Sequence, residues 1–213
     1  MESFFSIKKE HQVLILSFNN KETQTLTMSG ASCYYEDSKF YKKYIYKYHL
    51  IRNDKIQSNS YDGHNLSLKK IIKYYELSLK KNDILYEELN LYKKLIKYQK
   101  KNYRYIITKC EDDKSTLEHE KKHVLFYFNK KYRNYIKSIW ESLNDDIKNI
   151  IIEYLNTYHK KLYIDEFQAY ITTEPFVFLK NNKNKKKENI KLKKELLQIS
   201  NLINNWLKIY IKL

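Results

Sequence analysis

The sequence is short of the residues that break a chain or cross-link it. Its 213 residues include one proline, two glycines and two cysteines. So little proline and glycine excludes collagen-like chains, proline-rich linkers and sandwiches built on many tight turns, and it favours helices. The two cysteines, Cys33 and Cys110, are far apart and lack CxxC spacing. This excludes a disulfide framework and a thiolate zinc site, and we expect a reducing compartment.

Arginine is also scarce, although the chain is strongly basic. The formal net charge is +16, but only three of the 41 basic residues are arginine. Arginine, rather than lysine, is the side chain that recognises bases and phosphates through paired hydrogen bonds. The net charge therefore favours an acidic or nucleic-acid partner only weakly.

Long apolar runs are missing as well. No stretch of the sequence approaches the roughly 20 apolar residues of a membrane-spanning helix. The first residues lack the basic and apolar regions of a signal peptide. With 42% hydrophobic residues the chain has enough apolar side chains for a folded core. We expect a soluble intracellular protein, cytoplasmic or nuclear.

Periodicity predicts a mostly helical α+β fold with a small N-terminal sheet. Alternating or β-branched runs predict strands, whereas apolar residues three and four apart predict helices. Residues 53–65 are polar and predict a loop. The predicted strands are 12–18 and 24–28, paired as a hairpin, and 103–108. The predicted helices are 38–50, 66–101, 115–128, 132–143, 145–158 and 165–173.

One segment has a pattern that predicts metal chemistry. Residues 119–123 read HEKKH, within a helix that Ser115 or Thr116 can cap. On a helix, residues four apart share a face, so His119 and His123 can point at one ion. Two neutral imidazoles suit Zn²⁺, and Glu120 between them can handle a proton of the water that the ion activates.

This segment resembles the active-site helix of the zincin metallopeptidases. A predicted strand, Tyr103–Thr108, precedes it, as the edge strand that binds extended peptides does in zincins. Phe126 and Asn129 stand where the metzincin motif HExxHxxGxxH has its glycine and third histidine, so that branch is excluded. A later predicted helix instead offers Glu166 followed by Ala169, which is similar to the E-x-x-A pattern of compact gluzincins.

The resemblance implies a role for each residue of the motif. His119 and His123 would be zinc ligands, and Glu166 would be the third protein ligand. Glu120 would be the general base and later the proton donor. Residues 1–179 would form the catalytic domain, and its substrate would be a peptide or protein.

Other residues compete for two of these roles. His159 and Asp165 are alternative third ligands, although His159 lies at the expected exposed end of a helix and Asp165 at a helix N-cap. No residue stands out as an oxyanion stabiliser. Tyr158, Tyr163 and Tyr170 are the candidates in a chain of 22 tyrosines.

The C-terminal part supports an alternative function. Residues 180–194 are rich in lysine and predict a solvated linker, and 195–213 predict an amphipathic helix. Our leading hypothesis is a zinc-dependent peptide-bond hydrolase. The alternatives are a basic helical module that binds nucleic acid or protein, with a chance or inactive zinc motif, and a scaffold that docks a partner through the C-terminal helix.

Overall fold

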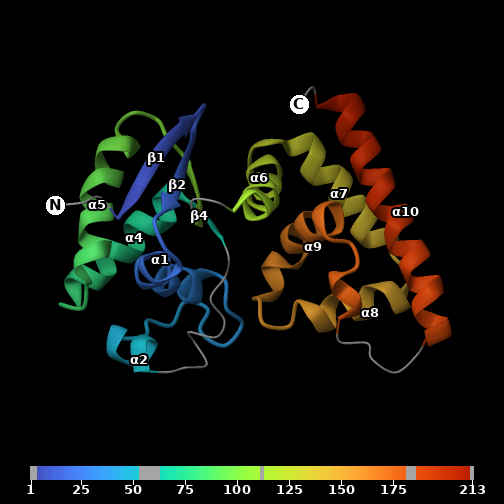
Figure 1. Ribbon diagram of the computed structural model, residues 1–213, viewed down its shortest axis with the longest axis horizontal. Helices are drawn as coiled ribbons and strands as arrows, with labels where there is room; N and C mark the ends of the chain where they lie inside the picture. The colour runs from blue at the N-terminus through green and yellow to red at the C-terminus, as the bar shows by residue number, and fades with distance from the viewer. Residues whose placement is uncertain (1–3, 53–62, 111–112, 181–185, 212–213) are drawn as a thin grey trace. The chain divides into compact units, whose positions relative to one another are not determined.

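The computed structural model describes residues 4–52, 63–110, 113–180 and 186–211. The chain divides into two compact units, Met1–Val124 and Leu125–Leu213. The boundary between the two units falls inside one helix, α6 (Lys114–Phe128). We describe each unit by itself (Figure 1).

The first unit contains a four-stranded mixed sheet. Its strands are β1 (Phe5–Glu10), β2 (Val13–Phe18), β3 (His64–Ser67) and β4 (Tyr105–Cys110). Their order is β1-β2-β4-β3, with β2 and β4 parallel and the other two pairs antiparallel. The predicted strands at 12–18 and 103–108 are confirmed. However, β2 pairs with β1, so the predicted hairpin with residues 24–28 is wrong.

Residues 24–28 instead belong to a helix. The buried residues Gln24, Thr27, Met28 and Ala31 are three and four apart, which is the spacing of a helical face. The side chain of Asn20 caps the N-terminus by accepting a hydrogen bond from the Thr23 amide at 2.8 Å. This cap and the buried face outweigh the β-prone composition, and Gly30 lies within the helix.

Four helices that the structure describes in full accompany the sheet. They are α1 (Lys21–Tyr35), α2 (Lys47–Arg52), α4 (Leu68–Lys80) and α5 (Tyr86–Gln99). The helical prediction for 66–101 is confirmed from residue 68 on as α4 and α5, with a break at Asn82, whose φ is 51°, and it is wrong for residues 66 and 67, which belong to β3. The helix predicted over 38–50 is wrong for most of its length, because α2 begins only at Lys47. Of the predicted loop, 53–62 lie outside the described residues.

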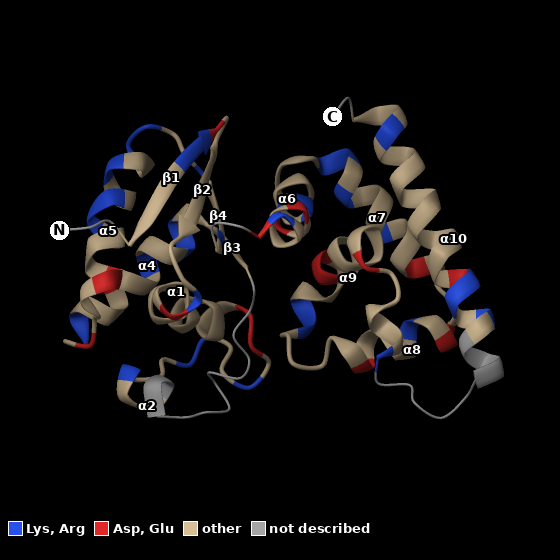
Figure 2. Ribbon diagram, in the orientation of Figure 1, with Lys and Arg blue, Asp and Glu red and all other residues tan. Residues whose placement is uncertain are grey.

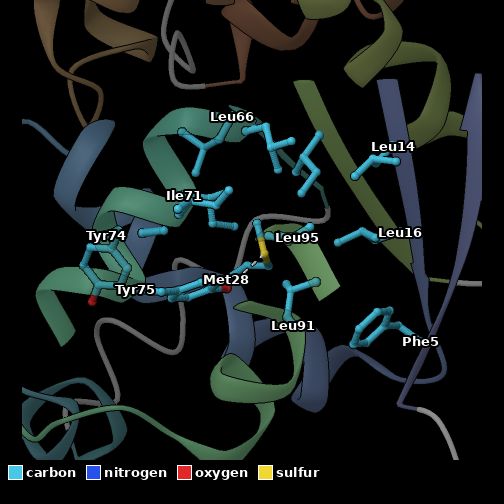
Figure 3. Close-up of a cluster of buried hydrophobic side chains, with 14 of the residues drawn as sticks. Phe5, Leu14, Leu16, Met28, Leu66, Ile71, Tyr74, Tyr75, Leu91 and Leu95 are labelled. Atoms are coloured by element: carbon cyan, nitrogen blue, oxygen red, sulfur yellow. Dashed lines mark hydrogen bonds between the residues drawn. The ribbon is translucent and has the colours of Figure 1, made fainter. Parts of the chain in front are cut away.

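Both faces of the sheet are covered. Leu14, Leu16 and Ile106 face a large apolar cluster with residues of α1, α4 and α5 (Figure 3). Val13 and Ile15 point to the opposite face, where Leu117 and Val124 of α6 pack against them. Burial on both faces explains why β2 is a continuous apolar run. It also fixes α6 against the sheet.

The regular elements that the structure describes in the second unit are all helices. It contains α7 (Lys130–Ser142), α8 (Asp145–Tyr154), α9 (Tyr163–Thr173) and α10 (Lys186–Tyr210). Two short 3-10 helices, Lys160–Leu162 and Val177–Leu179, flank α9. The three helices predicted between 132 and 173 are confirmed, with α8 ending four residues early.

The C-terminal helix corrects the predicted linker. Helix α10 begins at Lys186, so residues 186–194 are helical, and residues 181–185 lie outside the described residues. Its apolar face, with Leu196, Ile203 and Leu207 buried, packs against α8 and α9. This packing buries apolar residues that the scaffold hypothesis assigns to a partner, whereas Leu197, Leu202 and Ile209 stay exposed.

The fold class is therefore the predicted one, a mostly helical α+β protein with a small sheet. Figure 2 shows Lys and Arg on helices of both units, as expected of solvated helix surfaces. Among the described residues, the helices are too short or too polar to cross a membrane.

Candidate metal centre

The helix that carries the HEKKH segment has a different cap from the one predicted. Asp113 precedes α6, and its Oδ1 accepts hydrogen bonds from the Thr116 amide and the Ser115 hydroxyl, both at 2.9 Å. The Thr116 hydroxyl donates to Oδ2 of the same carboxylate. Ser115 and Thr116 thus lie inside the helix, and Asp113 does the capping that the sequence assigned to them.

One face of α6 is polar yet buried. Thr116, Glu120 and His123 are its buried residues, and their spacing of four and three places them on one face. His119 is partly exposed. A helix that packs apolar residues on a sheet and buries a glutamate and a histidine carries polar groups that need specific partners. Such a face is a common location for a functional site.

The two imidazoles lie close together. Nε2 of His119 and Nε2 of His123 are 3.3 Å apart, and the ring centroids are 5.1 Å apart. Two nitrogens that bind one tetrahedral Zn²⁺ at 2.0–2.1 Å are also about 3.3 Å apart. Burial, together with the charge of His123, lowers the pKa of His119 to about 3. This imidazole is therefore neutral at pH 7, which is the form that binds a metal.

Glu120 lies beside residues from elsewhere in the first unit. A Cβ atom at Gly63 would overlap the Glu120 carboxylate and the Thr116 methyl group. Glu36 at the end of α1 is 8% exposed, and burial raises its pKa to about 8. The charges of Glu120 and His123 both act on this carboxyl. A second buried acid therefore lies near the two motif residues.

In the second unit, Glu166 lies in the first turn of α9. It is 5% exposed and is followed by the buried residues Phe167, Gln168 and Ala169. The Gln168 amide side chain accepts a hydrogen bond from the Tyr132 hydroxyl at 2.9 Å, which ties α9 to α7. The prediction that Asp165 caps this helix is wrong, because the N-cap position is Leu162. Asp165 accepts a hydrogen bond from Gln168 instead.

In the first unit, His119 and His123 offer two imidazole nitrogens to one metal ion. In the second unit, Glu166 is a buried carboxylate and stays the predicted third ligand. The competing ligand His159 has another role, because it caps the 3-10 helix Lys160–Leu162, and its Nδ1 accepts from the Lys161 amide at 3.3 Å.

The tyrosine candidates differ in their surroundings. The hydroxyls of Tyr158 and Tyr170 are 3.3 Å apart, so these two rings share a polar contact. Burial raises the pKa of Tyr170, and the charge of Glu166 one helical turn earlier raises it further. Tyr163 opens α9 and is partly exposed. Among the three candidates, Tyr170 is thus the one whose pKa the charge of Glu166 raises, and the oxyanion role stays a prediction.

Sequence patterns do not point to Ser32, Glu36, Gly63 or His64 as neighbours of the motif or of its surroundings. Gly63 lies in a segment that predicts a loop, and the other three belong to no functional motif. They reach α6 or its neighbours through folding alone. The one available signal was the rarity of glycine, since Gly63 is one of two in the chain.

Comparison with known proteins adds no relatives, because no family model, curated protein or solved structure matches this chain.

Proposed function

We propose that the chain is a zinc-dependent peptide-bond hydrolase with His119, His123 and Glu166 as the protein ligands. The observation that carries this proposal is the pair of imidazole nitrogens 3.3 Å apart on one face of α6. The resemblance to gluzincins supplies Glu166, a buried carboxylate, as the third ligand. Two histidines and one glutamate are a donor set of catalytic zinc sites, which keep the fourth position open.

The donor set fits zinc better than other common divalent ions. Imidazole nitrogen suits zinc, whereas Mg²⁺ and Ca²⁺ prefer oxygen ligands in larger numbers. The neutral form of His119 supports the same assignment, because a protonated ring could not bind an ion. When bound, zinc would supply Lewis acidity that polarises the substrate carbonyl and lowers the pKa of water to about 7.

Glu120 is the general base in this proposal. It directly follows His119 and lies three residues before His123, it is 5% exposed, and it is not one of the three proposed ligands. Its carboxylate accepts a proton from the attacking water as the oxygen bonds to the carbonyl carbon. It then donates that proton to the departing amine nitrogen as the C–N bond breaks.

The substrate peptide is proposed to lie along β3. The resemblance to zincins implies an edge strand beside the active-site helix, but β4 lies between β2 and β3 and is not an edge. Within the described part of the chain, β3 is the last strand of the sheet on that side, and it follows Gly63, which adjoins Glu120. An extended peptide could therefore pair with β3 and reach Glu120.

Metal analysis of the purified protein tests this proposal. We expect about one zinc per chain, and we expect His119→Ala, His123→Ala and Glu166→Ala to bind it at least 10-fold more weakly. His159→Ala is the matched control and should bind zinc as the parent does. If all three ligand variants hold as much zinc as the parent, the proposed site would be refuted.

The activity assay uses a quenched fluorescent peptide library as the substrate. The parent should cleave it, and chelation should stop cleavage until zinc is restored. Glu120→Gln should keep the zinc and lose cleavage, because the variant lacks a proton acceptor but retains every ligand. A Glu120→Gln variant as active as the parent would contradict the role of Glu120.

The net charge of +16 supports the alternative of a basic binding module. Exposed lysines on α10, such as Lys193 and Lys194, would then contact an acidic partner. Such a module needs neither bound zinc nor a proton acceptor at Glu120, so the metal analysis separates the two functions.

A further inference from the structure

Gly63 leaves room for the carboxylate of Glu120. A side chain at this position would occupy the space of the Glu120 carboxylate and of the Thr116 methyl group. Thr116 lies one helical turn before Glu120 on the same buried face of α6. The backbone at Gly63 therefore forms one wall of the space in which the Glu120 side chain lies.

The neighbouring residue, His64, fixes the position of this wall. His64 opens β3, is 2% exposed, and pairs with Thr108 of β4. Its Nδ1 is 2.7 Å from the hydroxyl oxygen of Ser32, a fully buried residue of α1. The sheet and α1 thus both hold His64, and a short buried hydrogen bond between distant segments resists displacement.

We propose that Gly63 is a positioning residue for Glu120, and that the Ser32–His64 hydrogen bond holds Gly63 in place. The activity part of this inference rests on the proposed hydrolase function. A general base must lie within hydrogen-bond reach of the proton it accepts. A displacement of about 1 Å can cost on the order of 100-fold in rate.

The first test is Gly63→Ala, whose added methyl group would push the Glu120 carboxylate aside. We expect kcat to fall about 100-fold, with KM and zinc affinity within twofold of the parent. The matched control is Gly30→Ala, because a Cβ atom at Gly30 would overlap Tyr74 and Lys47. Gly30→Ala thus creates a similar steric overlap away from Glu120, and its kcat should equal that of the parent. Equal kcat values for Gly63→Ala and the parent would overturn the proposal.

A shorter side chain at position 120 tests the contact directly. Glu120→Asp withdraws the carboxylate by one methylene group, so it should relieve the overlap that Gly63→Ala creates. If the two substitutions acted independently, the fold-losses of activity in Gly63→Ala and Glu120→Asp would multiply in the double variant. We expect the loss in the double variant to be at least 10-fold smaller than that product. Losses that simply multiply would show that the two residues act independently, against the proposal.

Ser32→Ala tests the support behind Gly63. We expect kcat to fall about 10-fold without a change in zinc affinity, because His64 loses the partner that holds it. Ser78→Ala is the control, since Ser78 is also a fully buried serine of the first unit. If Ser32→Ala and Ser78→Ala lower kcat equally, Ser32 has only a general structural role. That result would overturn the proposal that the Ser32–His64 hydrogen bond holds Gly63 in place.

A final readout needs neither zinc nor activity. The ¹³C resonance of the Glu120 carboxyl carbon, assigned by its loss in Glu120→Gln, is recorded in metal-free protein. It should shift in Gly63→Ala and Ser32→Ala, and not in Gly30→Ala or Ser78→Ala. Such shifts in a protein that binds no zinc would refute the hydrolase and leave the positioning intact. If the parent binds zinc and cleaves peptides but the resonance is the same in Gly63→Ala and Ser32→Ala, the positioning role would be refuted and the hydrolase function kept.

Discussion

At the scale of single residues, the buried acid Glu36 makes stability depend on pH. Burial raises its pKa to about 8 from an ordinary value near 4.5, although Lys70, Ser32 and His123 favour its charged form. Between these values the folded state holds a proton that the unfolded state has released. The stability that Glu36 contributes is therefore complete below pH 4.5 and is lost as the pH rises through 8.

Glu36→Gln removes this dependence, because glutamine stays neutral and has nearly the same shape. The free energies of unfolding of parent and variant should agree at pH 4.5 and separate by at most about 1.4 kcal/mol per pH unit up to pH 8. The variant should be the more stable protein at pH 8. Urea titrations of the metal-free proteins at several pH values measure this, and parallel stability curves would contradict it.

A buried ion pair gives a second residue-scale prediction. Lys47 Nζ lies 2.5 Å from Glu88 Oε1 and 2.8 Å from the Tyr74 hydroxyl oxygen, with Lys47 4% and Glu88 0% exposed. Lys47→Met leaves Glu88 buried without its cation and should destabilise the fold by about 3–5 kcal/mol. The double variant with Glu88→Leu should recover most of this loss in urea unfolding. A double variant no more stable than Lys47→Met would count against this account.

The candidate site shows what sequence can predict at this scale. His119, Glu120 and His123 follow from helical spacing, and Glu166 came from a resemblance that only a motif supported. Glu36 and Gly63 were missed because their proximity to α6 depends on how α1 and β3 pack. Contacts between residues more than 50 positions apart have no local pattern that a single sequence reveals.

At the scale of secondary structure, α6 positions the histidines, and its cap is a point where it can be weakened. The Asp113 carboxylate accepts from the Thr116 amide and the Ser115 hydroxyl. Asp113→Ala should cost about 1 kcal/mol of folding stability, since it exposes the first amides of the helix. Ser115→Ala should cost less than half as much, because Ser115 donates to the cap and does not form it.

Urea unfolding at pH 7 compares these two variants with the parent. If Ser115→Ala loses more free energy of unfolding than Asp113→Ala, Ser115 would be the helix cap, as the sequence predicts, and Asp113 would not. We also expect Asp113→Ala to weaken zinc binding by less than 10-fold, because His119 and His123 lie beyond the first turn of α6.

The strands and helices that sequence patterns predicted correctly share a strong and uninterrupted signal. Strand β2 is buried on both faces and reads as a run of apolar residues, and the helices α4, α7 and α8 have clear apolar faces. The errors arose where tertiary packing outweighs composition. Residues 24–28 are β-prone yet form the buried face of α1, and the aromatic-rich residues 38–46 pack without forming a helix.

At the scale of the whole molecule, the net charge of +16 favours binding to polyanions such as nucleic acid. Basic proteins bind nucleic acid without sequence preference, and this binding weakens steeply with salt because it releases counterions. We expect such binding at 20 mM salt and its loss at 200 mM salt. It follows from lysines spread over many helices, and it requires no dedicated site.

Three exposed lysines of α10 test this expectation. Lys191, Lys193 and Lys194 are exposed, and Lys191 forms an ion pair with Glu195 at 3.7 Å. Replacing all three by Gln should reduce the slope of log K against log salt by at most about 3, and by less if they make few phosphate contacts. Peptide cleavage should not change, because the substitutions touch neither the proposed ligands nor Glu120.

Fluorescence anisotropy with a labelled 20-base-pair duplex measures the affinity of parent and variant across the salt range. Two duplexes of different sequence serve as the control for specificity. Binding that persists at 200 mM salt, distinguishes the two duplexes and disappears in the triple variant would favour the basic binding module. Weak binding that falls with salt equally for both duplexes would leave the zinc-dependent hydrolase as the function that the site supports.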